Sequence, residues 1–180
     1  MTSRKIYKTV GMGKGLWMDI TVDESLPEDS IDRWTTCVFG DGKPGSEVFT
    51  VPPHWHKNHS EYITVVEGRV AITLDGKTQV VQGGDPAIFI PARHTHSMKS
   101  FPNEKVTLEE KVVPAGAHKA QFFYDLLQND TYPGFWHAMR SFYDGDTYVP
   151  LPGNIGLIDE AFMFVMGNLA KLLAPSKAKL

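Results

Sequence analysis

Hydrophobic and polar positions alternate along more than half of the chain. From about residue 15 to 113, short runs rich in β-branched and aromatic residues are separated by Gly, Pro, Asp and Asn. A period of two is typical of strands with one buried face. The runs predict strands at 16–22, 33–40, 46–51, 61–68, 69–74, 77–81, 85–90, 96–101 and 104–113. Short strands at such close spacing favour a sandwich or barrel over βαβ units.

One connection between these runs carries a specific turn signal. Asp75-Gly76 stands between the alternating runs 69–74 and 77–81. An Asp-Gly pair suits a tight turn in which both central residues take positive φ angles. We therefore expect a β-hairpin at this point.

The hydrophobic period changes after Pro114. In residues 118–130, Phe122, Phe123, Leu126 and Leu127 share one stripe at helical spacing. Two further helices are expected, a short one at 134–145 and a longer one at 156–174 that Pro175 ends. The chain thus divides into a β-barrel over residues 1–117 and a helical extension over residues 118–180. We expect the extension to pack on the barrel or on a partner chain, because its apolar stripes would otherwise face water.

Composition and charge narrow the classes of function. The chain has 180 residues, 42% hydrophobic and 22% charged, and a net charge of −3. No basic patch favours a nucleic-acid partner, and no apolar run reaches the roughly 18 residues of a membrane span. The N-terminus lacks the apolar core of a signal peptide. Cys37 is the only cysteine, which excludes an intrachain disulfide and fits a cytoplasmic protein with an inert, buried thiol.

The candidate chemistry lies in residues 52–70, "PPHWHKNHSEYITVVEGRV", where three of the seven histidines are crowded together. Side chains two apart on a strand point to the same face, so His54 and His56 can aim two imidazoles at one point. Glu61 follows after a short interruption and can bring a carboxylate there from an adjacent strand. This is the beginning of a metal site that needs a further ligand.

That ligand appears in "GGDPAIFIPARHTHSMKS", which runs from Gly84-Asp85 through Pro91 to His96. The pattern His54-x-His56-x4-Glu61-x6-Gly68 resembles the first sequence motif of the cupin superfamily, and the later segment resembles the second. The resemblance implies a double-stranded β-helix, or jelly-roll barrel, of the single-domain type. It also implies that His54, His56, Glu61 and His96 bind a metal.

The pattern allows more than one role for three nearby residues. Arg93 stands where the second motif expects glycine. Either the turn geometry differs there, or the guanidinium is recruited to hold a substrate oxygen; a surface salt bridge is the alternative. His59 lies in the turn between strands and is expected to be solvated, and His94 is expected in a supporting or surface role.

Three imidazoles and one carboxylate suit divalent Fe, Mn, Ni, Co, Cu or Zn. On an octahedral ion they leave two open positions, as in catalytic sites. We expect a dioxygenase-type oxidoreductase acting on an apolar or aromatic small molecule, with Glu61 and Arg93 as candidate catalytic residues. The alternatives are a redox-neutral isomerase, cyclase or decarboxylase, and a non-catalytic binding module. Because cupins commonly pair through barrel edges, the expected state is a homodimer.

Overall fold

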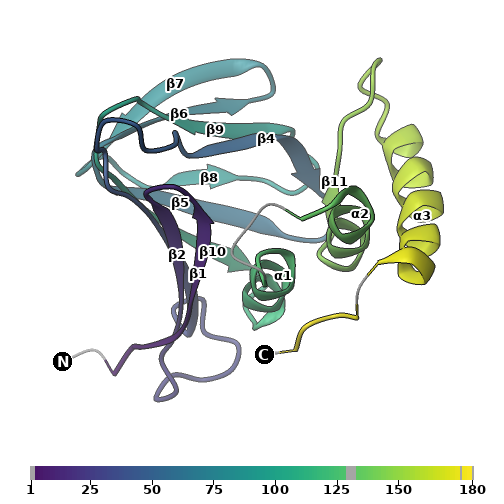
Figure 1. The fold of residues 1–180 in the computed structure, drawn as a ribbon, viewed down its shortest axis with the longest axis horizontal. Coiled ribbons are helices and arrows are strands. Elements are labelled where there is room, and N and C mark those ends of the chain that lie inside the picture. The colour runs from purple at the N-terminus through teal and green to yellow at the C-terminus, as the bar shows by residue number, and fades with distance from the viewer. Residues whose placement is uncertain (1–2, 129–132, 175, 180) are drawn as a thin grey trace.

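Two antiparallel sheets form a jelly-roll barrel, and the C-terminal helices lie along one side of it (Figure 1). The computed structural model describes residues 3–128, 133–174 and 176–179. The first sheet contains, in spatial order, β1 (Lys5–Gly13), β2 (Leu16–Val22), β3 (Trp34–Gly40), β10 (Val106–Val113), β5 (Ser60–Glu67) and β8 (Ile88–Ile90). The second contains β11 (Thr147–Tyr148), β4 (Thr50–His56), β9 (His96–Ser100), β6 (Arg69–Leu74) and β7 (Lys77–Gln82).

The alternation read from the sequence corresponds to the inner faces of these sheets. On β10, Val106, Leu108, Glu110 and Val112 are all buried, while the residues between them are at least partly exposed. Burying such a stripe against the opposite sheet provides the main favourable free energy of folding. Glu110 is the one charged residue in this inward series, and it lies beside the site described below.

Strand β1 extends the sheet beyond the predicted region, which began at about residue 15. It pairs with β2 and forms the sheet edge, and its residues Lys5–Thr9 are exposed. A strand with little buried surface has no apolar alternation to reveal it. It lies beside β2 because the short connection between Gly13 and Leu16 reverses the chain and brings the two strands together.

The predicted hairpin is confirmed. Leu74 pairs with Lys77, and Asp75 and Gly76 between them have φ angles of 47° and 78°. Both angles are positive, as a tight turn matched to the twist of the strands requires.

The three predicted helices are present as α1 (His118–Leu126), α2 (Phe135–Asp144) and α3 (Gly156–Leu173). The last part of the first predicted helix, residues 129–130, and the predicted stop at Pro175 lie outside the described residues. Helix α3 packs on α2 at Gly167, where a Cβ would lie 2.3 Å from the Tyr143 ring. No helix of the described residues is long and apolar enough to cross a membrane.

A buried carboxylate joins the helices to one another. Asp125 of α1 accepts hydrogen bonds from Arg140 Nη2 at 2.9 Å and Ser141 Oγ at 2.8 Å, both on α2. It also accepts one from the Ala178 backbone N–H at 2.8 Å. Ala120 and Leu127 meanwhile belong to the core of the barrel. The extension is therefore anchored at the barrel end where the candidate ligands lie.

Candidate metal centre

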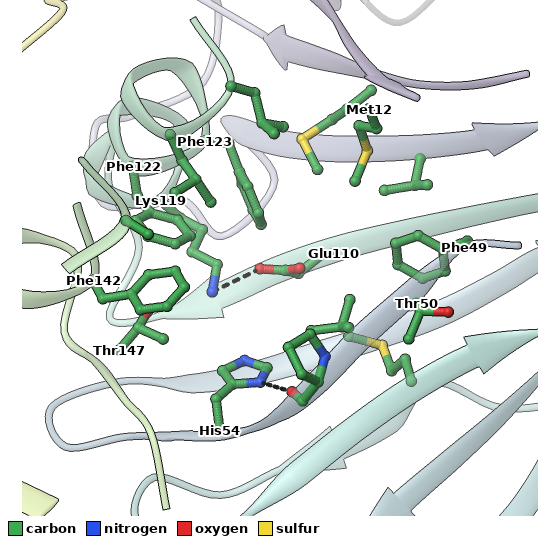
Figure 2. A pocket seen from close by; sticks show the side chains of 18 of the residues that line it. Met12, Phe49, Thr50, His54, Glu110, Lys119, Phe122, Phe123, Phe142 and Thr147 are labelled. Carbon is green, nitrogen blue, oxygen red and sulfur yellow. Dashed lines mark hydrogen bonds and ion pairs between the residues drawn. The ribbon is translucent and has the colours of Figure 1, made fainter. Parts of the chain in front are cut away.

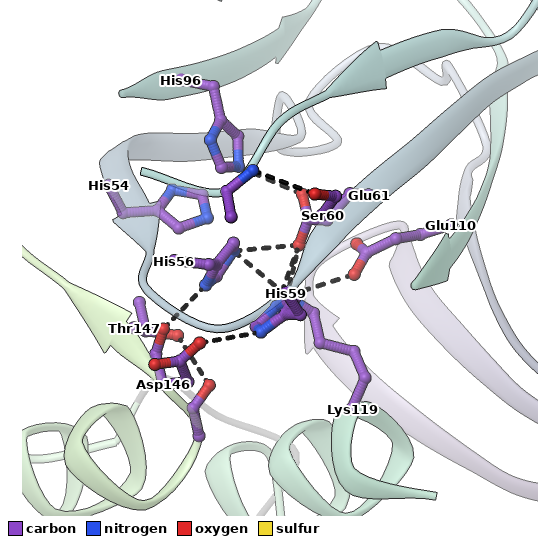
Figure 3. A network of polar contacts seen from close by, with 12 residues as sticks. His54, His56, His59, Ser60, Glu61, His96, Glu110, Lys119, Asp146 and Thr147 are labelled. Atoms are coloured by element: carbon purple, nitrogen blue, oxygen red, sulfur yellow. Dashed lines mark hydrogen bonds and ion pairs between the residues drawn. The ribbon is translucent and has the colours of Figure 1, made fainter. Parts of the chain in front are cut away.

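The four predicted ligands lie together inside the barrel (Figure 3). His54 and His56 come from β4, Glu61 from β5 and His96 from β9, and their ligand atoms all lie within 4.8 Å of one another. His54 pairs with His96 across β4 and β9, which accounts for their proximity. His56, Glu61 and His96 are at most 2% exposed.

Each of the three histidines is oriented by its backbone surroundings. Nδ1 donates to a carbonyl oxygen in every case: His54 to Pro52 at 2.9 Å, His56 to Asp146 at 2.9 Å and His96 to His94 at 3.1 Å. A neutral imidazole has a single N–H, so Nε2 keeps its lone pair. This is the arrangement by which proteins fix the tautomer and ring orientation of metal-binding histidines.

The charge states of Glu61 and His56 match this arrangement. Burial by itself would raise the pKa of Glu61, but the neighbouring Lys119 ammonium outweighs it and holds the pKa well below its usual range. Burial and the Lys119 ammonium lower the pKa of His56 to about 4. At neutral pH the site therefore presents an ionised carboxylate and a neutral imidazole.

These groups need a cation between them. Glu61 Oε1 lies 2.9 Å from His56 Nε2, and Glu61 Oε2 lies 3.1 Å from His96 Nε2. Since the Nδ1–H of each ring already binds a backbone carbonyl, the Nδ1-protonated tautomer directs an Nε2 lone pair at a carboxylate oxygen in both contacts. Glu61 Oε2 and His96 Nε2 are buried without a hydrogen-bond partner. Such orphaned acceptors are costly. The residues present thus fit a divalent transition metal.

Two charged residues that sequence reasoning did not select complete the polar cluster. Lys119 Nζ of α1 lies 2.6 Å from Glu61 Oε1 and 3.2 Å from Glu110 Oε1 on β10. Burial raises the pKa of Glu110 to about 7, against the opposing effect of Lys119. Glu110 had a signal in the sequence, since it occupies an inward position of an alternating strand. No sequence pattern marked Lys119 as a site residue, because its helix and the barrel strands come into contact only when the chain folds.

His59 is buried, contrary to the expectation of a solvated turn residue. It is 3% exposed, its Nδ1 lies 3.0 Å from Asp146 Oδ2, and its Nε2 lies 3.8 Å from Glu61 Oε1. Burial opposes protonation, but the Asp146 and Glu61 carboxylates raise the pKa of His59. Asp146 also accepts hydrogen bonds from the Asn58 backbone N–H and amide group, each at 2.7 Å. The helical extension therefore covers the turn that the sequence left in solvent.

Arg93 does not face the metal cluster, which corrects the expectation that it contacts a bound anion. Its side chain is 58% exposed, and Nη1 pairs with Glu160 Oε1 at 3.2 Å. Its φ angle of 68° shows that the turn keeps the conformation for which glycine is expected. The left-handed turn directs the side chain outward toward α3. His94 has the expected surface position, 46% exposed and paired with Asp75 at 2.5 Å.

Residues 43–108 match the family model described as a cupin domain. These residues therefore form a cupin domain. The match includes all four candidate ligands but ends before Glu110, Lys119 and Asp146. A comparison with curated proteins gives no significant match.

Solved structures with a similar fold include KdgF from Halomonas sp., at 21% identity over 56% of this chain and 79% of that chain, with a TM-score of 0.43. CapF from Staphylococcus aureus is similar at 21% identity over 52% of this chain, with a TM-score of 0.40, and the match spans 27% of CapF. A predicted oxalate decarboxylase from Thermotoga maritima is similar at 18% identity, over 63% of this chain and 96% of that chain, with a TM-score of 0.45. At these identities no activity is carried over from them.

The cupin barrel holds a cavity of about 320 Å³ that ends at the candidate metal ligands His54 and Glu61 (Figure 2). His54, Glu61, Glu110 and Lys119 line its polar end. The remaining wall is largely apolar and includes Met12, Phe49, Phe122, Phe123, Leu126 and Phe142. Since several of these residues come from α1 and α2, the helical extension forms part of the wall.

Proposed function

We propose that this cupin is a metal-dependent enzyme of the dioxygenase type, acting on an apolar or aromatic small molecule. The observation that supports the proposal is the position of the ligand cluster at the end of a largely apolar cavity. A concave apolar pocket with a few convergent polar groups is the usual form of a small-molecule site. Four protein ligands leave positions open on an octahedral ion, which distinguishes catalytic from structural sites.

His54, His56, Glu61 and His96 would hold the ion. When bound, the metal supplies a Lewis acid and, where it is redox-active, a partner for O₂. The protein contributes the rest. The apolar wall formed by Phe49, Phe122 and Phe142 excludes water around the reacting groups. Glu61 is the residue that we assign to proton transfer, because its carboxylate faces the cavity and is kept ionised by its neighbours.

The test begins with metal analysis of the protein from its native source, followed by reloading with Fe(II), Mn(II), Ni(II), Co(II), Cu(II) or Zn(II). O₂ consumption is then measured with acetylacetone, catechol and a flavonol as apolar or aromatic oxygen-bearing probes. We expect metal-dependent O₂ uptake with one class of probe. Glu61→Gln should retain part of the metal and lose turnover.

The same experiment decides between the proposed function and its alternatives. Equal conversion in anaerobic and aerated solution would replace the dioxygenase with a redox-neutral isomerase, cyclase or decarboxylase. Probe binding without conversion in either condition would indicate a non-catalytic binding module. A homodimer is also proposed, and static light scattering at micromolar concentration tests it. A particle of monomer mass would contradict the dimer.

A further inference from the structure

Lys119 is a buried lysine placed at the boundary between the metal cluster and the apolar cavity. It lies on α1, outside the strands that carry the four candidate ligands, and it lines the cavity together with Phe122 and Phe123 (Figure 2). The residue is 6% exposed. Its ammonium lies 5.4 Å and 5.3 Å from the centroids of the two phenyl rings. A buried charge in such surroundings requires partners.

The partners of Lys119 depend on the metal site. Nζ carries three N–H groups, and it contacts Glu61 Oε1 at 2.6 Å, Glu110 Oε1 at 3.2 Å and His56 Nε2 at 3.4 Å. A metal held by these residues would take the Nε2 lone pair of His56 and share the carboxylate of Glu61. At least one ammonium N–H would then need a new acceptor, and Lys119 lines the cavity end where a ligand could supply one.

The charges around Lys119 lead to the same conclusion. A divalent ion and the ammonium would bring three positive charges, and the Glu61 and Glu110 carboxylates supply at most two negative ones. The nearby Asp146 carboxylate is paired with His59 at 3.0 Å. Positive charge would thus be left at the end of an apolar cavity, where an uncompensated charge is costly. A ligand with a single negative charge removes that cost.

We propose that Lys119 is a specificity-determining residue whose ammonium binds the oxygen anion of an apolar, singly charged substrate, such as a carboxylate, an enolate or a phenolate. The inference rests on the proposed metal site and adds the substrate class to it. It assigns to the helical extension a group that contacts the substrate beside the metal. Its test is ligand binding, which needs no turnover.

The experiment uses the full-length protein loaded with zinc, which supports binding without O₂ chemistry. Calorimetry measures the affinity for three apolar monoanions, cinnamate, hexanoate and 4-phenylbutyrate, and for cinnamamide as the neutral isostere of cinnamate. We expect cinnamate to bind more tightly than cinnamamide. Lys119→Met should weaken cinnamate binding by about tenfold or more, the size of one charge-assisted hydrogen bond. Cinnamamide binding should change little, and Lys119→Arg should restore most of the loss.

Glu110→Gln separates recognition of the anion from a structural role of the buried ion pair. Both Lys119→Met and Glu110→Gln remove the ion pair between Lys119 and Glu110. They change the cavity charge in opposite directions, so Glu110→Gln should retain or increase cinnamate affinity. Weaker cinnamate binding in both variants would overturn the proposal. Lys171→Met is the control, because its helix α3 does not line the cavity.

The remaining outcomes are also decisive. If Lys119→Met does not fold or hold zinc, the Glu110→Gln result decides: retained or raised cinnamate affinity supports the proposal, and lowered affinity overturns it. Failure of all three monoanions to bind the zinc-loaded wild-type protein overturns it as well. Zinc content and O₂-dependent turnover are measured separately. Binding through Lys119 without turnover would refute only the dioxygenase proposal, and a protein that holds none of the six divalent metals would refute both.

Discussion

His54 and His96 lie directly opposite each other on β4 and β9, and their ring centroids are 4.1 Å apart. Each donates its Nδ1–H to a backbone carbonyl oxygen and keeps Nε2 for the cluster. Two imidazole rings at this distance gain little from each other in the absence of a cation. Removing one ring of this pair by substitution therefore tests the metal site directly.

We expect His96→Ala to remove most of the metal while the barrel remains folded, because one of four ligands is lost from a site with rigid geometry. Elemental analysis and circular dichroism measure the two effects. His94→Ala is the matched control, since His94 lies two residues away, exposed and paired with Asp75. A full metal complement in His96→Ala would show that the ligand assignment is wrong.

Asp146 should influence metal affinity without being a ligand. Its side chain holds the 58–59 turn through Asn58 and His59, next to the ligand His56. Asp146→Ala should weaken metal binding by roughly 10- to 100-fold, the usual cost of losing a group that supports the ligands. Competition with a chelator of known affinity measures this. Asp144→Ala is the control, because among the described residues Asp144 forms ion pairs only with Lys171 and Lys177, both at the surface. Equal affinities in both variants would contradict a supporting role.

Arg93→Gly should leave the metal in place and stabilise the protein slightly. A non-glycine residue at a φ of 68° costs about 1–2 kcal/mol, and the exposed ion pair with Glu160 returns at most about 1 kcal/mol. We expect a melting temperature equal to that of the wild type or a few degrees higher, measured by calorimetry. Loss of metal or of probe binding in this variant would restore Arg93 as a site residue.

Cys37 should react slowly with alkylating reagents. Burial, reinforced by the negative charge of Glu109, raises the pKa of its thiol from 9.0 to about 11. A pKa raised by 2 units lowers the thiolate fraction at pH 8 by about 100-fold. Iodoacetamide labelling, followed by mass spectrometry, should therefore be much slower in native protein than in urea.

The same shift predicts a pH dependence of stability. The unfolded chain loses the thiol proton more readily, so this contribution is intact below pH 9.0 and is lost as the pH rises from 9.0 toward 11. Comparing the free energy of unfolding with that of Cys37→Ala over this range isolates the effect. Equal labelling rates in the native and unfolded states would contradict the raised pKa.

Local patterns determined the parts of this protein that depend on neighbours in the chain. The period of two placed most of the strands, though not β1 or β11. The Asp75-Gly76 pair predicted its hairpin, and the helical period after Pro114 located α1, α2 and α3. The four candidate ligands were also accessible, because three of them lie within eight residues and motif spacing supplied His96. In these cases the physical cause, a repeated side-chain direction or a required φ angle, acts over a few residues.

The tertiary structure decided what depends on packing between distant segments. Lys119 lies beside Glu61, and Asp146 beside His59, only because the helical extension folds back over the barrel end. That covering buries His59, and the left-handed turn at Arg93 sends a guanidinium toward Glu160 and away from the cavity. A charged residue in a helix or turn has the same local pattern whether it faces water or a metal cluster. Its surroundings, and so its chemistry, are set by which distant surface the fold brings against it.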